Sequence, residues 1–90
     1  MIVRTVTVRH SEGLHLKAAG DFSQLANKFR SDITVEYAGR CINAKSLLGI
    51  LSLGIKSGMT IAISATGVDE QDAVDALVFQ AANAQNPLLI

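Results

Sequence analysis

The chain has 90 residues, of which 49% are hydrophobic and 18% charged, and its 8 Lys and Arg residues balance its 8 Asp and Glu residues. A chain of this length is expected to form one domain, residues 1–90, with a single core and little room for a deep enzyme cleft. Because the charges balance, we expect neither a nucleic-acid-binding surface nor a polybasic lipid-binding surface.

The first half of the chain predicts a strand, a helix and a second strand. Residues 2–8 alternate and are rich in β-branched side chains, which is typical of a strand. Apolar residues then recur at helical spacing from Leu16 to about Lys28. The expected apolar face of this helix consists of Ala18, Ala19, Phe22, Leu25, Ala26 and Phe29. Residues 33–37 alternate again and predict the second strand.

The next segments predict a hairpin followed by a short helix. Ala38 and Gly39 suit a tight turn, which leads into a short strand over residues 40–42. Residues 47–51 are apolar and follow Ser46, a residue type that commonly caps the start of a helix.

The last segments predict a fourth strand and a third helix. Residues 60–66 alternate, with Ile61, Ile63 and Ala65 facing inward. Asp69 is expected to begin the final helix, because acidic residues are favourable in the first turn. The predicted buried stripe of that helix is Val74, Leu77, Val78 and Ala81.

The order β-α-β-β-α-β-α predicts a two-layer α/β sandwich of the α+β class. Four strands would form one mainly antiparallel sheet, and three helices would pack on one of its faces. We expect the lone Cys41 to be a small, half-buried hydrophobic residue rather than a nucleophile. No Cys/His cluster with metal-ligand spacing, signal peptide or membrane span is evident, so a cytoplasmic protein without a metal or cofactor is expected.

The segment Gly13-Leu14-His15-Leu16-Lys17-Ala18-Ala19 could carry chemistry, because it places a histidine where a loop enters a helix. A phosphoryl group on His15 would meet the backbone amides of Leu16 and Lys17, and the Lys17 side chain would add a cation. Imidazole is a competent nucleophile near neutral pH. From spacing alone, however, a histidine that merely packs at the start of a helix is the commoner case.

The second such segment is Asn43-Ala44-Lys45-Ser46-Leu47-Leu48-Gly49-Ile50-Leu51. Ser46 reads as a helix cap, and the helix dipole would also tolerate a phosphate there. Leu47, Leu48 and Leu51 cannot all face the core from one short helix, so part of this group is expected to form an exposed docking patch.

Together these two segments resemble the HPr family of the bacterial phosphotransferase system. The family pattern is roughly G-[LI]-H-[AT]-R-P-A, followed about thirty residues later by K-S-[LI]. Further similarity lies in Leu51-Ser52-Leu53-Gly54, in Gly58, and in Gly67-Val68-Asp69-Glu70. The resemblance runs without gaps from about Val3 to Ala82.

The resemblance implies an open-faced sandwich in which His15 is phosphorylated on Nδ1 by enzyme I, which draws on phosphoenolpyruvate. The group would then pass to a IIA domain of a sugar permease. Ser46 would be the regulatory site of an HPr kinase/phosphorylase. Such a chain is a phosphoryl carrier and a substrate of other enzymes, without catalysis of its own.

Two positions depart from the family pattern, since Lys17 and Ala18 stand where Arg and Pro are usual. Lysine keeps the charge but lacks the planar guanidinium fork that suits phosphate, and Glu12 adds a nearby negative charge. An HPr-like regulatory protein that acts mainly through Ser46 therefore stays open as an alternative. A protein-binding module that is never phosphorylated, and docks through residues 47–51, is the alternative of another class.

Overall fold

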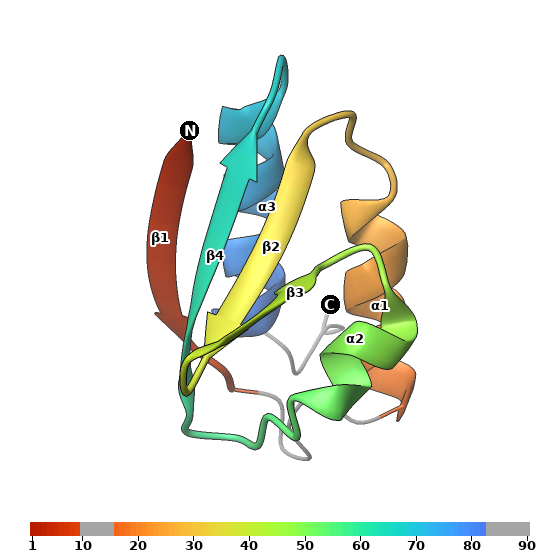
Figure 1. Ribbon diagram of the computed structural model, residues 1–90, viewed down its shortest axis with the longest axis vertical. Helices are drawn as coiled ribbons and strands as arrows, with labels where there is room; N and C mark the ends of the chain where they lie inside the picture. Colours follow the sequence, from red (N-terminus) through yellow and green to blue (C-terminus); the bar gives the residue numbers. More distant parts are fainter. Residues whose placement is uncertain (10–15, 83–90) are drawn as a thin grey trace, which may run out of the picture.

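The computed structural model describes residues 1–9 and 16–82. Its elements follow the predicted order (Figure 1). They are β1 (Ile2–Thr7), α1 (Leu16–Ala26), β2 (Asp32–Tyr37), β3 (Arg40–Asn43), α2 (Leu47–Ser52), β4 (Thr60–Thr66) and α3 (Glu70–Ala82). The predicted fold class, an antiparallel sheet with three helices, is confirmed.

The four strands form one sheet in the order β1-β4-β2-β3, and every neighbouring pair is antiparallel. Strand β4, one of the two central strands, pairs Ile61 with Val6 of β1 and Ile63 with Val35 of β2. This register places the inward residues of three strands side by side, as the alternating pattern predicts. The hairpin between β2 and β3 turns at Ala38 and Gly39, whose φ angles of 53° and 82° are both positive.

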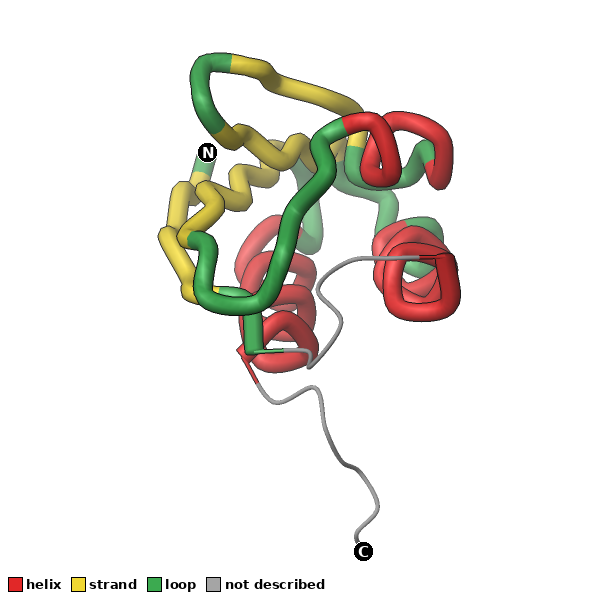
Figure 2. The backbone as a smooth tube through the Cα atoms, turned by 90° about the horizontal axis from the view of Figure 1, so that it is seen from below, coloured by secondary structure: helices red, strands yellow, loops and turns green. Residues whose placement is uncertain are grey.

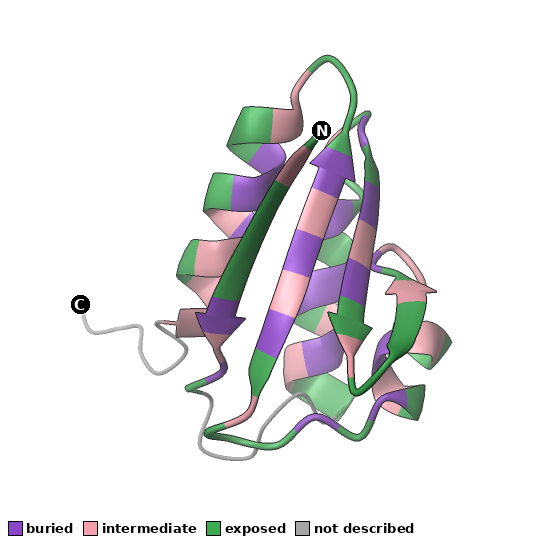
Figure 3. Cartoon of the chain, turned by 60° about the vertical axis from the view of Figure 1, so that its left-hand side comes forward, coloured by how far each residue is buried: buried purple, intermediate pink, exposed green. Residues whose placement is uncertain are grey.

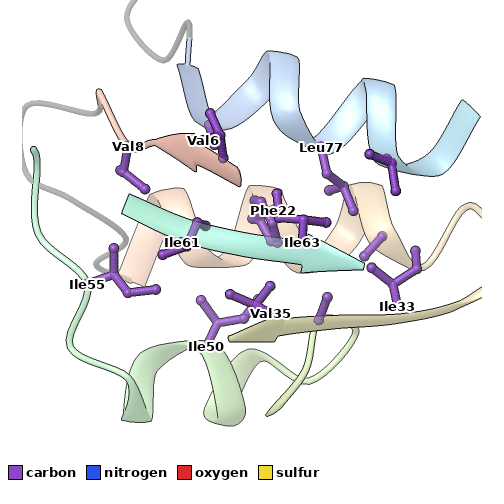
Figure 4. Close-up of a cluster of buried hydrophobic side chains, with 14 of the residues drawn as sticks. Val6, Val8, Phe22, Ile33, Val35, Ile50, Ile55, Ile61, Ile63 and Leu77 are labelled. Atoms are coloured by element: carbon purple, nitrogen blue, oxygen red, sulfur yellow. The ribbon is translucent and has the colours of Figure 1, made fainter. Parts of the chain in front are cut away.

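The helices cover one face of the sheet and leave the other face open (Figure 1). Figure 3 shows the alternation along β4, where Ile61, Ile63 and Ala65 are buried and the residues between them are not. The core lies between the sheet and the helices, with Phe22 of α1 and Leu77 of α3 reaching towards the strands (Figure 4).

The buried face of α1 differs by part of a turn from the predicted apolar face. Its buried residues are Ala19, Phe22, Ser23 and Ala26, whereas Ala18 and Leu25 are only half-buried. The reason is Ser23, whose hydroxyl donates to the carbonyl of Lys45 at 3.0 Å and so turns a polar residue inward. The spacing of apolar residues does not predict a buried serine whose hydrogen-bond acceptor lies 22 residues away.

Most predicted boundaries also move by one or two residues. α1 ends at Ala26, two residues before the predicted Lys28. The backbone amides of Lys28 and of the residue after it donate to carbonyls three residues back, as in a turn, instead of four residues back as in an α-helix. β1 ends at Thr7, one residue before the predicted Val8. Val8 is nevertheless fully buried, and its amide donates to the Met59 carbonyl at 2.9 Å.

The prediction of a half-buried Cys41 is wrong. Cys41 is exposed and lies opposite Glu36 in the pairing of β2 with β3. The neighbouring register pair joins Ile42 to the buried Val35, so Cys41 points to the sheet face that carries no helix.

The start of α3 is tied to the loop between α1 and β2. The Asp69 carboxylate accepts hydrogen bonds from the Arg30 amide at 2.9 Å, from the Ser31 amide at 3.0 Å and from the Ser31 hydroxyl. Beside it, a Glu70 carboxylate oxygen accepts from the Gly67 amide at 3.0 Å. Asp69 therefore joins two distant loops in addition to preceding the helix, which the sequence pattern does not reveal.

These hydrogen bonds give stability a dependence on pH. The Ser31 hydroxyl and the Arg30 amide hold the pKa of Asp69 below its ordinary value of 3.8. Since the folded pKa is depressed, the contribution of Asp69 is complete above that ordinary value and is lost as the pH falls through the folded pKa. We expect the urea midpoint of unfolding to drop as the pH is lowered below about 4. Asp69→Asn should make that drop shallower, whereas Asp72→Asn, at an exposed position of α3, should leave it unchanged.

Candidate functional site

The predicted phosphoacceptor, His15, lies outside the described residues, and the description of the chain resumes at the next residue. Leu16 and Lys17 are the first two residues of α1, and the first turn of α1 contains no acidic side chain. The first amides of a helix have no partner within the helix and favour an anion. Leu16 is 68% exposed.

Lys17 does not extend freely from the start of α1. Its Nζ atom lies 3.4 Å from Oδ2 of Asp21, one helical turn further along. The Lys17 and Asp21 side chains are 91% and 53% exposed. The cation that the sequence assigns to a phosphoryl group therefore has a carboxylate partner in this structure.

The segment before α2 is fastened to α1. The Lys45 carbonyl accepts hydrogen bonds from Ser23 and from the side-chain amide of Asn27, at 3.0 and 3.1 Å. The Lys45 ammonium donates to the Phe29 carbonyl at 2.7 Å, just beyond the end of α1. These contacts place α2 beside α1, as Figure 2 shows from below.

Ser46 caps α2, as predicted. Its backbone is extended, with φ −99° and ψ 113°, and its hydroxyl accepts a hydrogen bond from the Gly49 amide at 3.0 Å. A side chain at position 49 would crowd this cap, because a Cβ there would lie 3.3 Å from the Ser46 hydroxyl oxygen. The neighbouring Lys45 ammonium is engaged at Phe29, so it is not free to pair with Ser46.

The leucines of α2 divide between core and surface. Leu48 is 79% exposed, Leu47 and Leu51 are half-buried, and Ile50 is fully buried. The prediction that these leucines cannot all face inward is confirmed. We call Leu47, Leu48 and Leu51 the α2 apolar patch.

Other kinds of site find no support in residues 1–9 and 16–82. No group of three or more His, Cys, Asp or Glu residues in this part of the chain could hold a metal ion. Within the same residues, no helix is both long enough and apolar enough to cross a membrane.

Sequence reasoning missed the pairing of Lys17 with Asp21. A signal was available, because Lys17 and Asp21 are four residues apart in a helix, and such residues are neighbours on its surface. The described candidate features are thus the start of α1 with its paired cation, the capping serine of α2 and the α2 apolar patch.

The chain is similar to known proteins over most of its length. A family model described as the PTS HPr component phosphorylation site matches residues 2–83. The HPr-like protein Crh of Halalkalibacterium halodurans is 44% identical over 78 residues, which cover 87% of this chain and 93% of that protein. The phosphocarrier protein HPr of Cupriavidus necator is 37% identical over 83 residues, which cover 92% of this chain and 93% of that protein.

The fold is also similar to that of a solved structure. A crystal structure of HPr from Thermoanaerobacter tengcongensis superposes with a TM-score of 0.87 at 42% identity, covering 90% of this chain and 91% of that one.

Proposed function

Because the chain belongs to the HPr family of phosphocarriers, we propose that His15 accepts a phosphoryl group from enzyme I and passes it to a IIA-type acceptor. The observation that carries this proposal is the position of His15, immediately before the first residue of α1. An anion bound there would lie near the free amides of Leu16 and Lys17. The chain would thus be a substrate of other enzymes in the cytoplasm, as one HPr-like domain over residues 1–90.

The transfer requires a nucleophile and a place for the anion, but no base that activates water. Neutral imidazole supplies the nucleophile at physiological pH. Lys17 supplies a cation within the first turn of α1, although a lysine lacks the planar fork of an arginine. The exposed Leu48 of the α2 apolar patch offers a surface on which a partner protein can dock.

Regulation at Ser46 is the second part of the proposal. An HPr kinase/phosphorylase would add a phosphate to a serine that lies at a helix start and beside the α2 apolar patch. Because Lys45 is engaged at Phe29, the phosphate would stay largely unneutralised by this neighbouring side chain. A modified chain would therefore present negative charge next to an apolar surface.

The test is to map the phosphate after incubation with enzyme I and phosphoenolpyruvate. We expect one acid-labile phosphate, located on His15 by mass spectrometry and absent from His15→Ala. Label that survives this substitution, for instance on His10, would contradict the assignment. The absence of any label would contradict the phosphocarrier proposal and leave the HPr-like regulatory protein and the protein-binding module as alternatives.

A second candidate is an HPr-like regulatory protein that works mainly through Ser46. It is favoured by the 44% identity to a protein called HPr-like protein Crh and by Lys17 and Ala18 in place of the usual Arg and Pro. The two candidates differ in rate, because a regulatory protein would transfer phosphate from His15 slowly or not at all. Comparing the labelling rates of His15 and Ser46 with their respective enzymes separates them.

A further inference from the structure

Lys17 occupies an unfavourable place in α1. The N-terminal end of a helix carries partial positive charge, so a cation in the first turn is destabilising unless an anion lies nearby. Lys17 and Asp21 are the charged residues of α1, and the first turn has no acidic side chain. Asp21 is thus the anion that α1 itself provides for Lys17, at 3.4 Å.

The pair is weak and can exchange partners. Both side chains are largely exposed, and an ion pair in which Lys precedes the acidic residue by four positions is the less favourable orientation. A phosphoryl group carries more charge than a carboxylate, and on the residue before α1 it would meet the positive end of the helix. Lys17 would therefore leave Asp21 when such a group arrives.

We propose that Asp21 is a positioning residue that competes with the phosphoryl group for Lys17 and so limits how strongly the start of α1 holds phosphate. This inference rests on the proposed function of His15. In the transfer, a ring nitrogen of His15 forms a bond to phosphorus with its lone pair. The bond from phosphorus to the donor breaks, and the leaving atom keeps that electron pair. Lys17 gives up no proton and acts only through its charge.

The quantity to measure is the acid dissociation constant of the phosphoryl group on His15, because a nearby cation favours its dianion. His15 can be loaded without enzyme I by using potassium phosphoramidate, from which ammonia departs. The loading is done in a His10→Gln background, so that His15 is the remaining histidine of the two in the chain. The titration is followed by ³¹P NMR, and circular dichroism checks the helix content of each variant.

We expect Asp21→Asn to raise this dissociation constant about two- to threefold, since it frees Lys17 for the phosphoryl group. Asp21→Glu, which keeps the pair, should stay near the wild-type value. Asp75→Asn is the matched control, because Asp75 is 52% exposed and also pairs with a cation, Arg4 at 3.6 Å. It removes the same charge from another helix and should change the constant far less.

The decisive comparison repeats Asp21→Asn in a Lys17→Met background. If Asp21 acts through Lys17, most of the effect disappears there. An equal effect in both backgrounds would overturn the inference, because it would show that Asp21 acts directly on the phosphoryl group. No effect of Asp21→Asn in the wild type would overturn it as well.

The proposed function can fail separately from this inference. If phosphoramidate loads His15 but enzyme I does not, the phosphocarrier proposal fails, and the titration still decides the role of Asp21. Failure of phosphoramidate to load His15 would overturn both.

Discussion

We expect Gly67→Ala to lower the free energy of unfolding by about 3 kcal/mol, since two costs combine at this position. The φ angle of Gly67 is 154°, which side chains rarely adopt. A Cβ at this position would also lie 2.6 Å from the Ser31 hydroxyl oxygen and 2.7 Å from the Ser31 Cα. Ser31 is only 1% exposed and holds Asp69, so it cannot move aside without breaking that tie.

Urea unfolding measures this loss, and Gly54→Ala is its control. Gly54 has a φ of 62°, but a Cβ there would meet nothing within 4 Å. The control carries only the conformational cost, about 1 kcal/mol. Equal losses in the two variants would show that the loop around Ser31 yields easily, and that the contact between the two loops is not a rigid part of the fold.

This contact also marks a limit of prediction from the sequence. Alternation along β4 and helical spacing in α3 depend on neighbouring residues, and both elements lie where the pattern places them. The Asp69 carboxylate instead accepts a hydrogen bond from Ser31, 38 residues away in the sequence, and a local pattern does not predict a contact between such distant residues. Ser23 of α1 turns inward for the same kind of reason, because its partner, Lys45, lies in the loop between β3 and α2.

The candidate site was predictable where its signals are local. A serine before an apolar run predicts a helix cap, and the structure places Ser46 in that role. Three leucines on a helix of six residues exceed what one buried face can hold, and Leu48 is exposed accordingly. The pairing of Lys17 with Asp21 follows helical spacing and could have been expected.

The second large effect is expected from Ser46→Asp, which should slow labelling of His15 by enzyme I about tenfold while leaving the melting temperature nearly unchanged. An aspartate can still accept the hydrogen bond from the Gly49 amide, so the cap of α2 survives. What changes is the surface, because a negative charge then lies next to the α2 apolar patch. A partner that covers this patch must desolvate that charge, which weakens its binding.

Ser46→Ala provides the opposite control and completes the argument. It removes the bond to the Gly49 amide and should lower the free energy of unfolding by about 1 kcal/mol. It adds no charge, so labelling of His15 should continue at close to the wild-type rate. Ser46→Asp thus changes labelling and not stability, and Ser46→Ala changes stability and not labelling, which separates docking from folding. If Ser46→Asp unfolds the domain, or if both variants lose labelling alike, Ser46 is only a structural cap and the regulatory part of the proposal is wrong.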